Sequence, residues 1–126
     1  MKVIDTKKAP AAVGPYVQGM EQGEFIFTSG QLPIDPETGV LESDIEAATK
    51  QSLKNVLAIV EEAGGKLESI MKVNIFVKDM NDFGKVNAIY EEFFGSHKPA
   101  RSCVEVARLP KDGVIEIEAI AVKWYL

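Results

Sequence analysis

The sequence predicts an α+β domain in which two helices cover one face of a mixed six-stranded sheet. Two long segments carry apolar residues at helical spacing, whereas shorter segments around them are rich in β-branched and aromatic residues or alternate apolar with polar ones. Five of the six strands can be assigned to residues, and the elements follow one another as strand, strand, helix, strand, helix, strand and strand. Two amphipathic helices cannot cover both faces of such a sheet, so we expect self-association to cover the other.

Length and composition fit one globular domain spanning residues 1–126. Apolar residues make up 46% of the chain and charged residues 26%, which excludes a disordered or fibrous protein. The net charge is -5, and the basic residues do not cluster. Because such a chain repels polyanions, we expect no nucleic-acid partner.

Cysteine and histidine each occur once, as Cys103 and His97. One cysteine excludes an internal disulfide and fits a reducing compartment, and this pair is too small for a zinc site, so we expect no metal. The longest apolar run, residues 56–60, is far shorter than the ~20 residues that a membrane-spanning helix needs. We therefore expect a cytoplasmic protein with no membrane partner.

The first predicted element is a β-hairpin. Residues 25–28 are aromatic and β-branched and lie between Gly23 and Gly30, which is typical of a strand. Residues 16–20 are the expected partner strand, across a turn at residues 21–23. Three turn-forming residues then mark a loop: Pro33, Pro36 and Gly39.

A long helix follows the loop. Ser43 and Glu46 have the spacing of a capping box, in which each side chain bonds the other residue's backbone N–H. Apolar residues then recur at three- and four-residue spacing over residues 45–63. Gly64 and Gly65 end this helix.

A second helix is predicted to begin at a cap on Asn81 or Asp82 and to end at Phe94, before Gly95. Its apolar stripe contains one polar side chain, Asn87. A buried amide at that position either makes a helix-to-strand hydrogen bond or lines a pocket. The sequence leaves both interpretations open.

Three strands complete the prediction, over residues 71–77, 101–107 and 115–124. A turn at residues 109–113 joins the last two. In each strand, side chains of opposite character alternate, so that one face is apolar and the other carries polar groups.

Two of these polar faces are candidates for chemistry. Arg101, Cys103 and Glu105 share one face, which we expect to look outward from the helix-packed core, and Glu116 and Glu118 share another. One interpretation is that both faces are simply solvated surface. The other is that the two strands are neighbours and that an arginine and a glutamate on them flank a pocket. The planar fork of an arginine binds a carboxylate at two points, and a glutamate can hold or deprotonate a water.

Other candidates are less specific. Tyr16 follows a Gly-Pro turn and either packs in the core or turns its phenol to a ligand. Ser29 and Gly30 end a strand where the backbone can approach a ligand closely, or simply form a turn. Cys103 has no histidine near it in sequence, which argues against a nucleophile. His97 lies in a short loop and is expected to be exposed.

The chain also resembles the Rid (reactive intermediate/imine deaminase) family over its full length. The most specific match is the run PARSCVEVARLPKD at residues 99–112, followed by IEIEA at residues 115–119. Shorter matches are APA and GPY near the N-terminus, TSGQ at residues 28–31, QSLKNV at residues 51–56 and FVKD at residues 76–79.

This resemblance implies a chorismate-mutase-like α+β fold assembled as a homotrimer, with ligand sites in clefts between subunits. It also implies hydrolysis, without a cofactor, of 2-iminobutanoate, 2-iminopropanoate and their enamine tautomers to 2-keto acids and ammonia. Such intermediates arise when pyridoxal phosphate enzymes dehydrate serine or threonine. The resemblance assigns the substrate carboxylate to Arg101, the attacking water to Glu116, and proton management to Tyr16. It assigns the remaining pocket positions to Ser29, Gly30, Asn87 and Cys103.

Two alternatives come from the same superfamily: a non-catalytic metabolite-binding or regulatory protein, and a ribonuclease-type translation inhibitor. Arg101 favours the enzyme, because binding branches of the superfamily lack that arginine. The net charge of -5 disfavours an RNA substrate.

Overall fold

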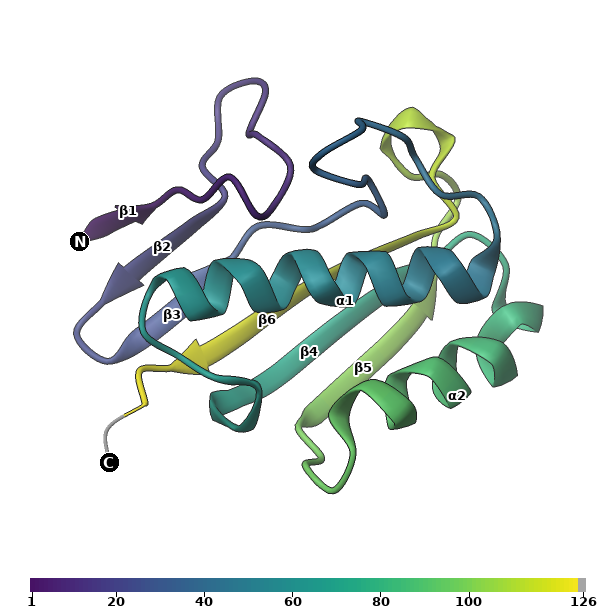
Figure 1. Cartoon of the computed structure of the whole chain (residues 1–126). Coiled ribbons are helices and arrows are strands. Elements are labelled where there is room, and N and C mark those ends of the chain that lie inside the picture. Colours follow the sequence, from purple (N-terminus) through teal and green to yellow (C-terminus); the bar gives the residue numbers. More distant parts are fainter. Residues whose placement is uncertain (125–126) are drawn as a thin grey trace.

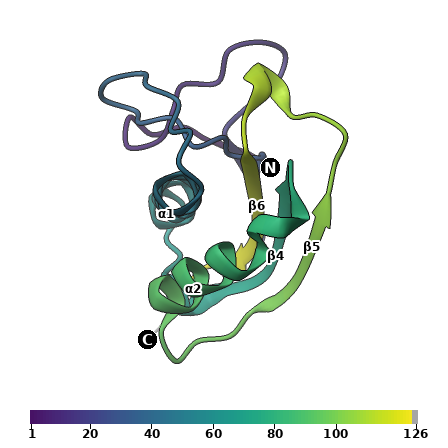
Figure 2. The same cartoon turned by 90° about the vertical axis from the view of Figure 1, so that its right-hand side faces the viewer.

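Two helices pack on one face of a six-stranded sheet, which confirms the predicted fold class (Figure 1). The computed structural model describes residues 1–124. Figure 2 views the sheet nearly edge-on and shows both helices on the same side of it. The elements are β1 Lys2–Ile4, β2 Gly19–Gln22, β3 Phe25–Thr28, α1 Ile45–Glu62, β4 Ile70–Val77, α2 Phe83–Phe94, β5 Ala100–Glu105 and β6 Ile115–Val122.

The strand order across the sheet is β1-β2-β3-β6-β4-β5. Only β4 and β5 pair in parallel, and the other neighbouring strands pair antiparallel, so the sheet is mixed as predicted. α2 forms the crossover between the two parallel strands and lies on the same side of the sheet as α1 (Figure 1). The last strand, β6, therefore lies in the middle of the sheet, and β5 lies at its edge.

Both helices end where the sequence predicts, but their first turns differ from the prediction. The N-cap of α1 is Asp44, whose carboxylate accepts a hydrogen bond from the N–H of Ala47 at 3.0 Å. Asp44 rather than Ser43 therefore satisfies one of the free N–H groups of the first turn. α2 follows a short 3₁₀ turn, and its N-cap, Asp82, makes no side-chain capping bond.

The N-terminal strands are the main departure from the prediction. β1 was not predicted, and β2 begins at Gly19, so most of the predicted strand at residues 16–20 is loop. Gln18 explains the shift, because its buried side chain is bonded to the segment before it rather than to a strand. Its amide donates hydrogen bonds to three backbone carbonyls, those of Thr6, Ala9 and Pro10, at 2.8–3.2 Å.

The core lies between the helices and the sheet. Ile115 and Ile117 of β6 point into it and are fully buried, whereas Glu116 and Glu118 point to the opposite face and are half-buried. This is the alternation that the sequence predicts. None of the helices in residues 1–124 is both long and apolar enough to cross a membrane.

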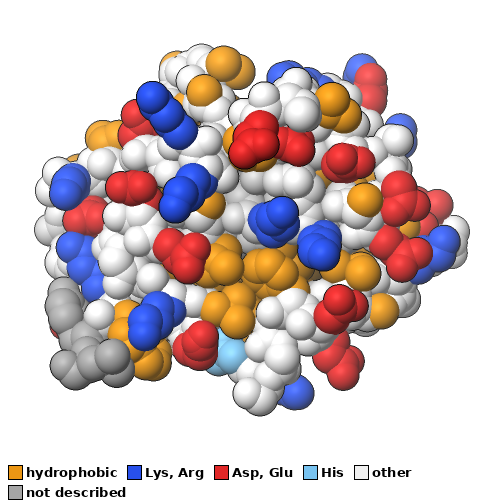
Figure 3. All heavy atoms as spheres, viewed as in Figure 1, with side chains coloured by type: hydrophobic (Ala, Val, Ile, Leu, Met, Phe, Trp, Pro, Cys, Tyr) orange, Lys and Arg blue, Asp and Glu red, His pale blue; other side chains and the backbone are white. Residues whose placement is uncertain are grey.

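No element within residues 1–124 covers the second face of the sheet (Figure 2). The strand register places Phe27 beside Ile120 on this face, and Val104 of β5 lies farther along it. Phe27 is 45% exposed and Val104 47% exposed. On the helix side, Lys, Arg, Asp and Glu side chains of both signs surround a patch of hydrophobic side chains (Figure 3). The uncovered sheet face thus exposes apolar side chains beside polar ones such as Glu116 and Glu118.

Candidate functional site

Arg101 points toward the helix side of the sheet, so the prediction that its face looks outward is wrong. In the parallel register Arg101 lies beside Val73 and Cys103 beside Ile75, and both of these β4 residues are buried beneath the helices. β5 is an edge strand, so its side chains emerge at the margin of the core, next to α2.

Three side chains of α2 surround the guanidinium of Arg101. Its Nη1 donates a 2.7 Å hydrogen bond to Oδ1 of Asn87. Its central carbon lies 4.8 Å from the ring centre of Tyr90 and 5.5 Å from that of Phe83. Asn87 thus makes the helix-to-strand hydrogen bond that was one of its two predicted roles, and its partner is a candidate site residue.

A cavity of about 540 Å³ opens beside this group. Asn87 and Arg101 both line it, together with Tyr90, Glu91, Phe94, Gly95, His97, Lys98 and Pro99. His97 is half-buried rather than exposed, with its Nε2 2.7 Å from the carbonyl oxygen of Ile70. This bond fixes the loop that leads into β5.

Cys103 lies two residues beyond Arg101 on the same face of β5. Partial burial raises the pKa of its thiol, and the nearby Arg101 only partly opposes that shift. A thiol with a raised pKa is a poor nucleophile at neutral pH. Within residues 1–124, Cys103 lines neither this cavity nor a second one at one end of β6.

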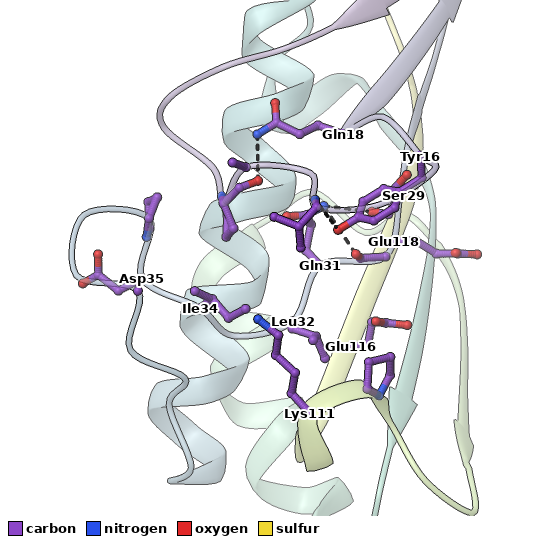
Figure 4. Close-up of a pocket in the computed structure, with 17 residues that line it drawn as sticks. Tyr16, Gln18, Ser29, Gln31, Leu32, Ile34, Asp35, Lys111, Glu116 and Glu118 are labelled. Atoms are coloured by element: carbon purple, nitrogen blue, oxygen red, sulfur yellow. Dashed lines mark hydrogen bonds between the residues drawn. The ribbon is translucent and has the colours of Figure 1, made fainter.

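A second cavity, of about 720 Å³, lies at one end of β6 (Figure 4). It brings together four of the predicted site residues, Tyr16, Ser29, Gly30 and Glu116. Tyr16 is 50% exposed, so it does not pack in the core. The hydroxyl of Ser29 donates a 2.6 Å hydrogen bond to the carbonyl of Val17, which ties the end of β3 to the loop that carries Tyr16.

Glu116 occupies a tightly enclosed position in this cavity. A Cβ atom on Gly30 would lie 2.8 Å from both the carboxyl carbon and Oε1 of Glu116. Burial, and to a smaller extent the charge of Glu118, raise the pKa of the Glu116 carboxyl. The close backbone approach predicted at Gly30 is therefore an approach to the Glu116 side chain.

If Glu116 positions the attacking water, as the resemblance implies, replacing Gly30 by alanine is expected to reduce turnover by roughly 10- to 100-fold, because a displaced reacting group commonly costs about that much. The new methyl group would overlap the carboxyl group of Glu116 and push it aside. Gly84→Ala is the matched control, since a Cβ at that position in α2 meets nothing within 4 Å. Equal turnover numbers for the two variants would show that Glu116 needs no fixed position.

Asn55 was not singled out from the sequence, although it shapes the same cavity. It lies on α1, is completely buried, and its amide donates hydrogen bonds to the carbonyls of Leu32 and Ile34 at 3.2 and 2.9 Å. Both of those residues line the cavity. An asparagine at a core-facing position of a predicted helix indicates a buried hydrogen bond. That signal would have identified Asn55.

Within one chain the two cavities do not meet. β4 lies between β5 and β6, and Arg101 and Glu116 project from opposite faces of the sheet. One hypothesis from the sequence was that these two residues flank a pocket on neighbouring strands. Within a single chain, that hypothesis is wrong. No group of three or more His, Cys, Asp or Glu side chains in residues 1–124 could hold a metal ion.

The structure thus shows a small α+β protein with two separate cavities, one lined by Arg101 and the other by Glu116. The sequence model of the endoribonuclease L-PSP family matches residues 6–123. The chain therefore belongs to that family, which is the Rid family identified from its motifs.

Relatives of known structure or function resemble the chain along its whole length. It is 61% identical to the 2-iminobutanoate/2-iminopropanoate deaminase of Salmonella typhimurium, over 97% of this chain and 98% of that protein. The crystal structure of the Escherichia coli YjgF gene product matches it with a TM-score of 0.95 at 59% identity, covering 98% of this chain and all of that one. The structure of Escherichia coli TdcF with bound serine also gives a TM-score of 0.95, at 50% identity and the same coverage.

Proposed function

We propose that the protein hydrolyses 2-iminobutanoate and 2-iminopropanoate, with their enamine tautomers, to 2-keto acids and ammonia. The observation that carries this proposal is that one cavity of the chain contains an arginine held by α2 and the other contains a half-buried glutamate of raised pKa. The 61% identity to a 2-iminobutanoate/2-iminopropanoate deaminase supports the same reaction. TdcF, crystallised with serine, shows that a relative holds a small amino acid.

The chemistry needs orientation, water and proton transfer. Arg101 binds the substrate carboxylate through its two-pronged fork. Glu116 accepts a proton from a water molecule as that water adds to the imine carbon, which a protonated nitrogen makes electrophilic. Glu116 then passes this proton to the amine nitrogen of the adduct, the carbon–nitrogen bond breaks and ammonia leaves. The added hydroxyl group loses its proton as the keto group forms, with the Tyr16 hydroxyl assisting the proton transfers. These steps use side chains alone, so the proposal includes no cofactor and no metal.

The complete site is proposed to form between copies of the chain in a homotrimer. Arg101 and Glu116 lie on opposite faces of one sheet, so a neighbouring copy must bring the missing half. The uncovered sheet face, which exposes Phe27 and Val104, supports this arrangement. Ser29, Gly30 and Tyr16 then come from the Glu116 copy, and Asn87 and Cys103 from the Arg101 copy.

Mixed assemblies test this sharing directly. Arg101→Ala and Glu116→Gln chains, each inactive alone, are unfolded together and refolded at equal concentration. In a shared site, random mixing restores about one quarter of the wild-type sites, because a quarter of neighbour pairs combine both intact residues. Ammonia release measures the recovered activity, and wild-type chains taken through the same unfolding and refolding are the control. Light scattering should report about three times the chain mass. Trimers without recovered activity would mean that both residues act within one copy.

The pH dependence provides a separate test of Glu116. Because the pKa of its carboxyl is raised, the carboxylate that accepts the proton is lost as pH falls through a value above that of an ordinary glutamate. The acid limb of the kcat profile should lie there. Glu118→Gln removes the charge that contributes to the shift, so this limb should move to lower pH. An unmoved limb would assign the titration to another group.

A non-catalytic metabolite binder is the alternative within the family, and the assay separates the two. A binder would hold pyruvate yet release no ammonia from freshly generated 2-iminobutanoate, whereas the enzyme does both. The single cysteine fits the cytoplasm, where we also place the reaction.

A further inference from the structure

We propose that Phe83 and Tyr90 are positioning residues, whose rings hold the Arg101 guanidinium in the orientation that receives the substrate carboxylate. This inference rests on the proposed function and adds two residues to it. The central carbon of the guanidinium lies 5.5 Å from the ring centre of Phe83 and 4.8 Å from that of Tyr90, within the range of cation–π attraction.

The spacing along α2 explains why the rings reach the same group. Phe83, Asn87 and Tyr90 are separated by four and then three residues, which places all three on one face of the helix. The arginine rises from β5 against that face. One hydrogen bond and two ring contacts thus restrain a side chain that is otherwise long and flexible.

The hydrogen-bonding pattern leaves the guanidinium able to bind a ligand. Among residues 1–124 the Arg101 side chain donates to Asn87 alone, through Nη1. A ring contact consumes no N–H donor, so the aromatic residues can fix the plane of the fork while its other donors remain for a carboxylate. A further hydrogen-bonding neighbour would hold the fork equally well but would occupy those donors.

The Tyr90 hydroxyl does not contribute to this role. It is buried and makes no hydrogen bond within the described residues. Burial raises the pKa of the phenol, with Arg101 opposing the shift, so the group is neutral at pH 7 and does not pair with the arginine as an anion. The ring alone should therefore suffice, and removing an unsatisfied buried hydroxyl should cost the fold little.

The test compares Tyr90→Leu and Phe83→Leu with Tyr90→Phe. Each leucine variant should raise KM for 2-iminobutanoate, and the Kd for pyruvate measured by calorimetry, by roughly 3- to 30-fold. Turnover at saturation should change much less, because Glu116 and its water lie elsewhere. Tyr90→Phe, which keeps the ring, should rescue both constants. Phe93→Leu is the matched control, since Phe93 is a half-buried aromatic of the same helix that packs on Phe94 rather than on Arg101.

Thermal melting and light scattering identify any leucine variant that has lost its fold, and Phe83, only half-buried, is the safer of the two sites. Wild-type KM and Kd in folded leucine variants would overturn the positioning role, as would equal damage in Tyr90→Phe and Tyr90→Leu. Arg101→Ala separates this failure from a failure of the proposed function. If that variant also binds pyruvate normally, the carboxylate anchor itself is wrong; if it alone loses binding, only the role of the rings is wrong.

Discussion

Replacing Arg101 by alanine is expected to abolish measurable imine hydrolysis while the protein still folds and assembles. A short imino acid has little apolar surface, so its carboxylate must supply most of the binding energy. Truncating one partner of a buried, hydrogen-bonded charge pair commonly costs about 2–5 kcal/mol. Arg101 lies on an edge strand outside the main apolar core, so the fold should tolerate its loss. Ammonia and keto-acid release from freshly generated 2-iminobutanoate measure the effect.

Two further variants make this result specific. Arg101→Lys should restore little activity, because an ammonium group lacks the planar fork. Arg108→Ala should retain activity, since within residues 1–124 that exposed arginine forms its ion pair with Asp112 on the surface. Unchanged pyruvate binding in a folded Arg101→Ala trimer would remove the main support for the proposed mechanism.

Glu116→Gln is the second change with a large expected effect, a fall in kcat of about 10²–10⁴-fold, the usual loss of a general base. The amide has nearly the shape of the carboxyl group and can still hold a water, but it cannot accept the proton. KM and pyruvate binding should therefore stay close to wild type, which distinguishes this variant from Arg101→Ala. Steady-state kinetics at several pH values provide the measurement.

A wild-type kcat in Glu116→Gln would move the catalytic role to another carboxylate of the same cavity. Glu118 is the next residue to test, because it follows Glu116 on the same face of β6 and lines the same cavity. It already accepts a 3.0 Å hydrogen bond from Asn74, which makes it less available to a water.

Most of the fold was predictable because its elements have local signals. The apolar spacing of α1 and α2, the glycines after them, and the alternation along β6 each depend on residues close together in the chain. The N-terminal strands could not be predicted in the same way. β1 has only three residues, and the start of β2 depends on hydrogen bonds from Gln18 to residues eight to twelve positions earlier.

The candidate site residues could be chosen from the sequence, but their arrangement in space could not be predicted. Alternation shows that Arg101 and Val104 face opposite ways, but only the pairing with β4 decides which of them faces the helices. The sequence likewise does not reveal that β4 separates β5 from β6. From the sequence, Phe83 and Tyr90 cannot be distinguished from ordinary core positions of an amphipathic helix. The apolar spacing of a helix does not show which side chains of other elements pack against it.

The placement of Arg101 and Glu116 on opposite faces of the sheet also bears on inheritance. In the proposed trimer each chain contributes to two sites, one through each residue. Two alleles that each lack one of the residues should complement one another in the same cell. An allele that lacks both should behave as a dominant negative, because every such chain disables the sites that it shares with normal copies.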